Sequence, residues 1–410
     1  MSWTIYAARG FVNKRGEFDP AQINDGLDLG FYPAIVTISK ANNKKAINDT
    51  CKYLKEKEIY GIPMKITSHG RGEFIDSRMP EVKDSIDLVI KLNERYGKKI
   101  IREIDFHFGA LHTFGEEYDI RKKALEEGVI YDNIAATYTA EEYYSAKKNA
   151  EGNLNKIKKH AQKYGIEIWI ENVSINNFAT RDYLPLLNKM GRKPEYTEED
   201  LNKDKRFRDT KWIPEELHLG DFGFLIDQKS SGICLDIEHF GITVEHSKVY
   251  NFETMGRPKM DKWQEKVFNE CGIYIEKGKP VLFEKEIDPI KTIEELGDNI
   301  EICHLMGYQG NGMFYYDIID GRKVKKISTH MPILFEGDRD PLKIVEDDNV
   351  RTDLARKTEK TLKSYLKVLN KTGCRKAMTE IHIGSIYTGP IWKEYHKTSL
   401  RNIKSILNSL

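Results

Sequence analysis

Short apolar runs alternate with longer amphipathic stretches along most of this chain. Apolar runs bounded by polar or glycine-containing segments are typical of buried strands, whereas apolar positions three and four residues apart predict helices. Strands are predicted near residue 5 or at 34–39, and then at 64–68, 100–106, 166–170, 232–237, 300–303 and 376–379. Helices are predicted at 44–57, 80–96, 139–164, 292–296, 350–369 and at the end of the chain.

This alternation of strands and helices predicts the fold. Helices between successive strands indicate βα units and a parallel sheet. About seven or eight such units suit a (β/α)8 TIM barrel, an α/β fold in which one domain spans residues 1–410. A doubly wound open sheet is the alternative, but no GxGxxG follows an early strand and no GxxxxGK[ST] occurs. We therefore expect a barrel without a dinucleotide or P-loop site.

Two stretches interrupt the βα rhythm and are interpreted as large loop insertions on the catalytic face of the barrel. Residues at about 181–222 are highly charged and poor in core side chains, and residues at about 244–289 hold short pieces separated by Pro and Gly. Residues 313–328 resemble a hairpin, with Asp320 and Gly321 as its turn.

Composition and charge narrow the class of protein. The chain has 65 basic and 64 acidic residues and a formal net charge of +1, so no global positive field draws it to nucleic acid or anionic lipid. No signal-like segment or membrane-length apolar run occurs, which predicts a cytoplasmic protein that does not engage a membrane. The five cysteines are scattered without CxxC spacing and are expected to be reduced, buried thiols.

Acidic and imidazole side chains occur where the predicted strands end. Glu171, Asp236, His304 and Glu380 each follow several apolar residues and precede a loop. A parallel barrel collects such strand ends on one face. Buried carboxylates repel one another unless a cation or protons neutralise them, and carboxylates with imidazole suit Zn²⁺, Mn²⁺, Co²⁺ or Fe²⁺. The pattern therefore predicts a divalent metal site.

Further histidines extend this pattern. His69 and His107 end two predicted strands, His239 follows Asp236 by three positions, and His330 follows the predicted hairpin. His160, His246 and His396 lie in predicted helices or loops, and we interpret them as structural residues.

In the order and strand placement of these residues, the sequence resembles the xylose-isomerase-like TIM-barrel superfamily, and within it endonuclease IV. The likeness runs from about residue 60 to the C-terminus without the two insertions. It implies a first zinc held by His69, His107 and Glu171. It implies that Glu171 bridges to a second zinc held also by Asp236, His304 and Glu380, and that a third is held by His239 and His330.

This sequence departs from the endonuclease pattern at two places. Ser328 stands where that family has an aspartate ligand of the third metal, and Leu305, Met306 and Gly307 follow His304 where the family has Asn-Asp. These departures are consistent with a retained fold and a changed substrate.

The first functional hypothesis is phosphoester hydrolysis with two or three zinc ions. A hydroxide between two zincs would attack phosphorus near the catalytic residues Glu171 and Glu380, because metal binding lowers the pKa of water towards ~7. The substrate would contain phosphate, and DNA could bind through local basic loops. The basic side chains concerned are Arg192, Lys193, Arg206 and Arg208.

The second hypothesis is isomerisation or epimerisation of a small sugar or sugar phosphate. Related barrels hold one divalent metal, such as Mn²⁺ or Co²⁺, with a Glu, Asp, His, Glu set that matches Glu171, Asp236, His304 and Glu380. The two glutamates would then move a proton, and His239 would bind a substrate hydroxyl. A non-enzymatic binding barrel is the third hypothesis. His330, where single-metal members often have Arg, favours the first.

Overall fold

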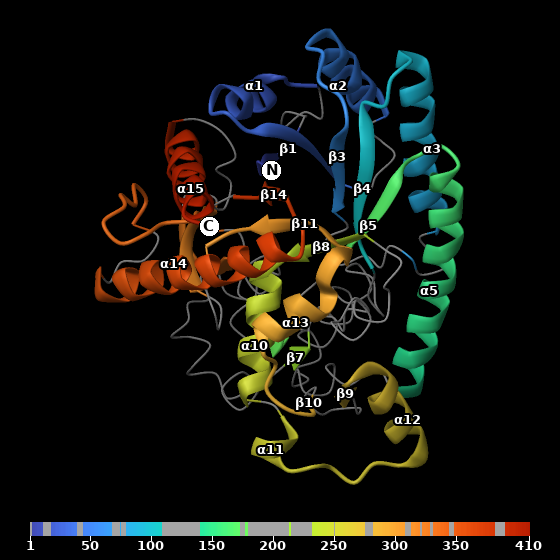
Figure 1. Cartoon of the computed structure of the whole chain (residues 1–410), viewed down its shortest axis with the longest axis vertical. Helices are drawn as coiled ribbons and strands as arrows, with labels where there is room; N and C mark the ends of the chain where they lie inside the picture. Colours follow the sequence, from blue (N-terminus) through green and yellow to red (C-terminus); the bar gives the residue numbers. More distant parts are fainter. Residues whose placement is uncertain are drawn as a thin grey trace.

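Eight parallel strands close into a barrel in the computed structural model of the chain (Figure 1). The structure describes residues 2–10, 18–38, 44–67, 74, 79–108, 140–172, 177–178, 213–214, 232–249, 251–274, 282–307, 313–319, 322–328, 331–343, 348–381 and 390–410. The barrel strands are β1 (Thr4–Gly10), β2 (Tyr32–Ile38), β3 (Ile62–Thr67), β4 (Ile101–His107), β5 (Glu167–Glu171), β8 (Gly232–Asp236), β11 (Ile300–Leu305) and β14 (Lys376–Thr379). The predicted (β/α)8 class is confirmed.

The barrel order follows the chain order, since each strand pairs with the next and β14 pairs with β1. Residues 5 and 34–39 had been alternative positions for the first strand, and the structure uses both, as β1 and β2. The connection between them contains α1 (Ala21–Asp28), a short helix that the periodicity did not predict.

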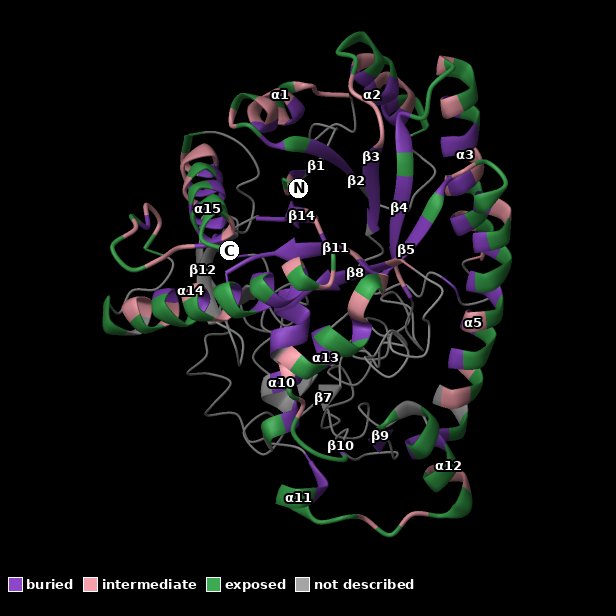
Figure 2. Cartoon of the chain, in the orientation of Figure 1, coloured by how far each residue is buried: buried purple, intermediate pink, exposed green. Residues whose placement is uncertain are grey.

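Helices cover the outside of the barrel with their apolar faces turned inward (Figure 2). They are α2 (Lys44–Glu56), α3 (Met79–Tyr96), α5 (Ala140–Gln162), α10 (Ile237–Val249), α13 (Pro289–Leu296), α14 (Asp348–Lys371) and α15 (Pro390–Asn408), and a 3-10 turn (Gly297–Asn299) follows α13.

Local sequence signals set the ends of some helices. Helix α13 begins with Pro289, and the Asp288 side chain accepts hydrogen bonds from the first backbone N–H groups. Among the described residues, no helix is both long and apolar enough to cross a membrane.

The predicted insertions are described to different extents. Most of residues 181–222 lie outside the described residues, and Ile213–Pro214 forms β7 against β6 (Asn177–Phe178). Residues 244–289 hold the end of α10, then α11 (Phe252–Met255), α12 (Lys262–Cys271), and the pair β9 (Ile273–Tyr274) and β10 (Leu282–Phe283). A capping box between Asp261 and Gln264 begins α12, a signal that the sequence interpretation missed. The division into one domain with two insertions stays a prediction.

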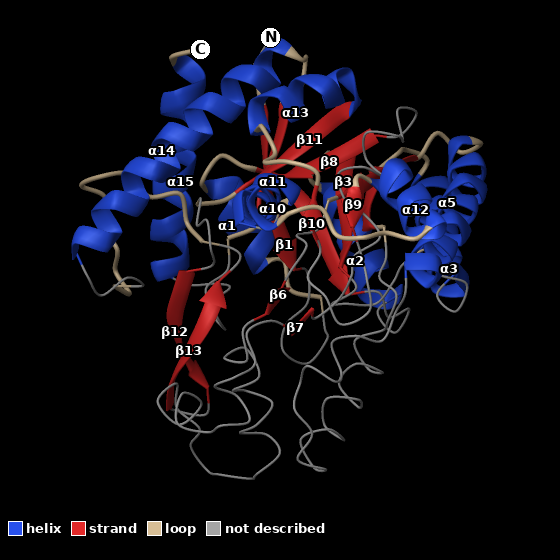
Figure 3. Ribbon diagram, turned by 90° about the horizontal axis from the view of Figure 1, so that it is seen from below, coloured by secondary structure: helices blue, strands red, loops and turns tan. Residues whose placement is uncertain are grey.

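A hairpin projects from one side of the barrel (Figure 3). Its strands are β12 (Met313–Ile319) and β13 (Arg322–Ser328), antiparallel and in register from Met313 with Ser328 to Ile319 with Arg322. The predicted hairpin is therefore present, and its strands flank the Asp320–Gly321 turn position.

Two apolar layers hold the barrel together. The outer layer lies between strands and helices, and the inner one fills the barrel with side chains from six strands: Tyr6, Ala34, Trp169, Cys234, Ile302 and Met378. Trp169 packs against Gly232, where an added Cβ would lie 2.2 Å from Trp169 Cδ1. Four cysteines, Cys51, Cys234, Cys303 and Cys374, are buried and free, as predicted. Above the inner layer, towards the carboxyl ends of the strands, the interior becomes polar.

Candidate functional site

Four of the predicted metal ligands meet inside the carboxyl end of the barrel. Glu171 ends β5, Asp236 ends β8, His304 lies in β11, and Glu380 follows β14. His304 Nδ1 lies 2.9 Å from Glu171 Oε1, 3.6 Å from Asp236 Oδ2 and 4.0 Å from Glu380 Oε2. All four are buried, and Glu380 is the most exposed of them at 8%. Residues separated by up to about two hundred positions in the chain thus surround one small volume.

The local backbone orients Asp236 towards this volume. Asn172 binds the backbone of Asp236 on both sides, accepting from its N–H at 2.7 Å and donating to its carbonyl oxygen at 3.0 Å. Helix α10 begins at the next residue, and Asp236 Oδ1 accepts from the backbone N–H groups of Glu238 and His239. This capping uses one carboxylate oxygen and leaves Oδ2 facing His304.

His107 and His239 lie beside the same group. His107 ends β4, and its Nε2 is 3.2 Å from Glu171 Oε2. His239 lies in the first turn of α10, with Nε2 4.0 Å from Asp236 Oδ2. Glu171 therefore faces His304 with one oxygen and His107 with the other.

His69 and His330, the remaining predicted ligands, lie outside the described residues, as do the basic residues Arg192, Lys193, Arg206 and Arg208. Their roles stay predictions. The structure describes the backbone of Ser328 as the last residue of β13.

Lys65 lies at the centre of the ligand group and was missed by the sequence interpretation. Its Nζ donates to Glu171 Oε1 at 2.9 Å and to Glu380 Oε2 at 2.5 Å, and lies 3.4 Å from His304 Nδ1. The residue is 2% exposed. The sequence signal for this residue is a single lysine in the apolar run of β3. Side chains alternate along a strand, so Lys65 faces the barrel interior while its neighbours Met64 and Ile66 face outward.

The ammonium of Lys65 and the carboxylates around it stabilise one another in their charged forms. Burial by itself lowers the pKa of Lys65, but Glu171 and Glu380 outweigh it, and the pKa is raised well above its ordinary value. Burial also disfavours the Glu171 carboxylate, but Lys65 and His304 hold the pKa of Glu171 well below its ordinary value. Glu171 is therefore an ionised base and Lys65 an ammonium.

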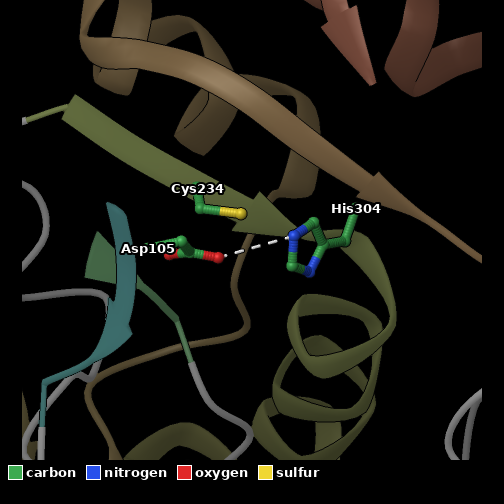
Figure 4. A group of neighbouring side chains, drawn as sticks. All are labelled: Asp105, Cys234 and His304. Atoms are coloured by element: carbon green, nitrogen blue, oxygen red, sulfur yellow. Dashed lines mark ion pairs between the residues drawn. The ribbon is translucent and has the colours of Figure 1, made fainter. Parts of the chain in front are cut away.

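Asp105 is a second residue that the sequence interpretation missed. It pairs in register with Lys65 across β3 and β4, is fully buried, and its Oδ2 lies 3.6 Å from His304 Nε2. Figure 4 shows this contact beside Cys234, which with Asp105 and His304 forms a further group of potential ligand atoms. Burial, with the charge of Glu171, raises the pKa of Asp105 to about 7.

The orientation of His304 is the one that metal-bound histidines adopt. Its Nδ1 faces the carboxylates of the ligand group while its Nε2 faces Asp105, and a carboxylate on the far ring nitrogen fixes the tautomer of a ligand. Burial lowers the pKa of His304, but Glu171 and Asp236 outweigh it and raise the pKa to about 10. Without metal, the ring is therefore cationic.

The residues present fit a divalent cation. Ligand atoms of Glu171, His304 and Glu380 all lie within 4.8 Å of one another, and so do those of Glu171, Asp236 and His239. Asp236 Oδ2 is buried and makes no hydrogen bond within the described part of the chain. Carboxylate and imidazole donors of this kind bind Mn²⁺, Co²⁺, Zn²⁺ or Mg²⁺.

Comparisons with known proteins found similar folds. No family model and no curated protein matches the chain. A solved D-tagatose 3-epimerase-like protein is 12% identical, with 99% of this chain and 97% of that chain covered and a TM-score of 0.43. D-Psicose 3-epimerase from Clostridium cellulolyticum H10, solved with D-tagatose, is 8% identical, with coverages of 98% and 99% and a TM-score of 0.45.

A xylose isomerase-like TIM barrel protein from Mycobacterium smegmatis, in complex with magnesium, is 12% identical, with coverages of 99% and 98% and a TM-score of 0.43. At these identities and TM-scores the likeness supports no conclusion about activity. The narrower resemblance to endonuclease IV finds no counterpart among these three proteins and stays a prediction.

Proposed function

We propose that this protein is an isomerase or epimerase that uses one divalent metal ion to act on a small sugar or sugar phosphate. This was the second hypothesis from the sequence, and one observation now favours it over phosphoester hydrolysis. A buried ammonium, that of Lys65, lies within the ligand group.

The charge balance of the barrel interior is the reason for favouring the isomerase or epimerase hypothesis. Among the described residues, the ammonium of Lys65 faces the buried carboxylates of Asp105, Glu171, Asp236 and Glu380. Charge in a dry interior is costly unless it is compensated. With this ammonium, one divalent ion leaves the group about one negative charge short of neutrality, two leave about one positive charge in excess and three leave about three, so the balance argues against the three-zinc site.

The metal would be held by Glu171, Asp236, His304 and Glu380, and when bound it would supply a Lewis acid for a substrate carbonyl oxygen. The chain's own part is proton transfer. Glu171 and Glu380 come from different strands and both reach one nitrogen atom, so they flank a single small volume.

Glu171 is ionised and takes the proton from the carbon beside the substrate carbonyl, leaving an enediolate. For epimerisation, Glu380 takes up a proton as the substrate binds and delivers it to the other face of the same carbon. For isomerisation, Glu171 returns its proton to the neighbouring carbon while a second proton moves between the two enediolate oxygens. His107 and His239 border the same volume and bind substrate hydroxyls.

Two measurements test this proposal. Metal analysis of the purified chain should find one ion, with activity restored by Mn²⁺ or Co²⁺ after chelation. A panel of ketoses and their phosphates, incubated in D₂O, should take up deuterium at the carbon beside the carbonyl. Glu171→Gln and Glu380→Gln should each slow this exchange by about 10²–10⁴-fold, the usual contribution of a positioned acid or base.

His160→Ala is the matched control, because His160 pairs with Asp87 on the outer helices and should leave exchange unchanged. Two or three zinc ions per chain, with cleavage of a phosphodiester and no deuterium uptake, would support the first hypothesis instead. His69→Ala separates the two further: it removes a metal under the hydrolase hypothesis and leaves the metal content unchanged under this one.

A further inference from the structure

Lys65 stands where a cation of the ligand group would stand. Its Nζ contacts three of the four proposed ligands, at Glu171 Oε1, His304 Nδ1 and Glu380 Oε2, and these three residues also form one group of potential metal ligands. Together with the cationic ring of His304, the ammonium therefore supplies positive charge to the group when no metal is bound.

A metal ion and this ammonium compete for the same oxygens. Carboxylate oxygens bind such ions at about 2.0–2.2 Å. An ion bonded to Glu380 Oε2 would lie within about 5 Å of Nζ at its present distance of 2.5 Å, in an interior that screens like charges poorly. The ammonium also occupies acceptor sites on both glutamates that the ion needs.

We propose that Lys65 is a built-in counter-cation that is exchanged for the metal: it neutralises the ligand group in the metal-free protein and leaves that group when a divalent ion binds. The inference rests on the proposed one-metal site, but it concerns metal affinity and stability, not the reaction.

Asp105 is the acceptor to which the ammonium moves. It is the register partner of Lys65 on the adjacent strand, and its charge already acts on the lysine. Both carboxylate oxygens are buried and make no hydrogen bond to any described residue. A nearby cation stabilises a buried carboxylate that makes no hydrogen bond. The displaced ammonium therefore remains inside the barrel and pairs with Asp105.

The test compares metal binding by the wild type with that of Lys65→Met, which keeps the length and removes the charge. Calorimetric titration of chelator-treated protein with Mn²⁺ should show affinity higher by about tenfold or more in the variant, because no cation has to be displaced. Lys376→Met is the matched control. Lys376 also lies on a barrel strand and pairs with a buried glutamate, Glu103, but near the amino end, so its removal should leave the Mn²⁺ affinity unchanged.

Thermal unfolding gives an independent readout. Removing metal should lower the melting temperature of Lys65→Met far more than that of the wild type, and Mn²⁺ should restore it, since the variant lacks the ammonium that contacts Glu171 and Glu380. If Lys65→Met does not fold, Lys65→Gln, which keeps hydrogen-bond donors, takes its place. Crystals of the wild type soaked in Mn²⁺ should show Nζ withdrawn from Glu171 and Glu380.

Equal or weaker Mn²⁺ affinity in the variant, or bound Mn²⁺ with Nζ still on both glutamates, overturns the inference and leaves the proposed function standing. Tighter Mn²⁺ binding by the variant, with no deuterium uptake by any ketose, supports the inference and removes the proposed function.

Discussion

Replacing Asp105 with asparagine tests whether the polar interior is built for a metal at the expense of stability. Asp105 is fully buried, and its oxygens make no hydrogen bond to the described residues. The substitution removes a buried charge with little change in volume. If Asp105 serves only the fold, its replacement should destabilise the protein. If it is kept for function at a cost in stability, its replacement should make the protein more stable.

The pKa of Asp105 sets the magnitude and the pH window. Burial raises this pKa from 3.8 to about 7, so between these values the native protein binds the proton more tightly than the unfolded chain does. The wild type therefore loses stability as pH rises through this window. At 1.36 kcal/mol per pKa unit, Asp105→Asn should be more stable by up to about 4 kcal/mol near pH 8 and by only about 1–2 kcal/mol near pH 5.

The same substitution should weaken metal binding. Asp105 faces His304 Nε2, and loss of such a partner carboxylate commonly costs about 10–100-fold in metal affinity. Urea unfolding of the metal-free proteins near pH 5 and pH 8, with Mn²⁺ titration of both, measures the two effects. A variant that is less stable near pH 8 and binds Mn²⁺ as tightly as the wild type would refute the reasoning.

Further predictions concern packing and charge away from the site. Lys158 on α5 has a buried Nζ without a hydrogen bond among the described residues, and burial lowers its pKa to about 8. The unfolded chain binds this proton more tightly, so wild-type stability rises with pH between about 8 and 10.5. Lys158→Met should gain about 1–3 kcal/mol near pH 7 in urea unfolding, and the gain should vanish above about pH 10.5. Gly232→Ala would place a Cβ against the Trp169 indole and should cost about 1–3 kcal/mol by overpacking. Gly152→Ala within α5 meets no atom within 4 Å and should gain about 0.5–1 kcal/mol, so equal effects at these two glycines would contradict the packing described.

Much of the fold follows from local pattern. The apolar runs that end at Glu171 and Asp236 are strands because their branched and aromatic side chains fit a sheet buried on both faces. Helix α14 follows from its apolar stripe. Helix α12 was missed because its few apolar positions lie among Pro, Gly and charged residues, and a capping box supports it instead.

The candidate site could be predicted in part. Glu171, Asp236, His304 and Glu380 were recognised because a polar residue after an apolar run marks a strand end, and a barrel gathers such ends. Lys65 and Asp105 carry no such mark, because each lies within a strand, where a charged residue is more often exposed.

The order of strands and helices and the chemistry of their ends can be predicted from local sequence, since both depend on side chains close together in the chain. Which face of each strand lies inside the barrel depends on closure of the sheet, because alternation along a strand defines two faces without distinguishing inside from outside. Closure placed the ammonium of Lys65 between Glu171 and Glu380 and the carboxylate of Asp105 behind His304. The charge balance that argues against three metal ions is thus a property of the closed barrel.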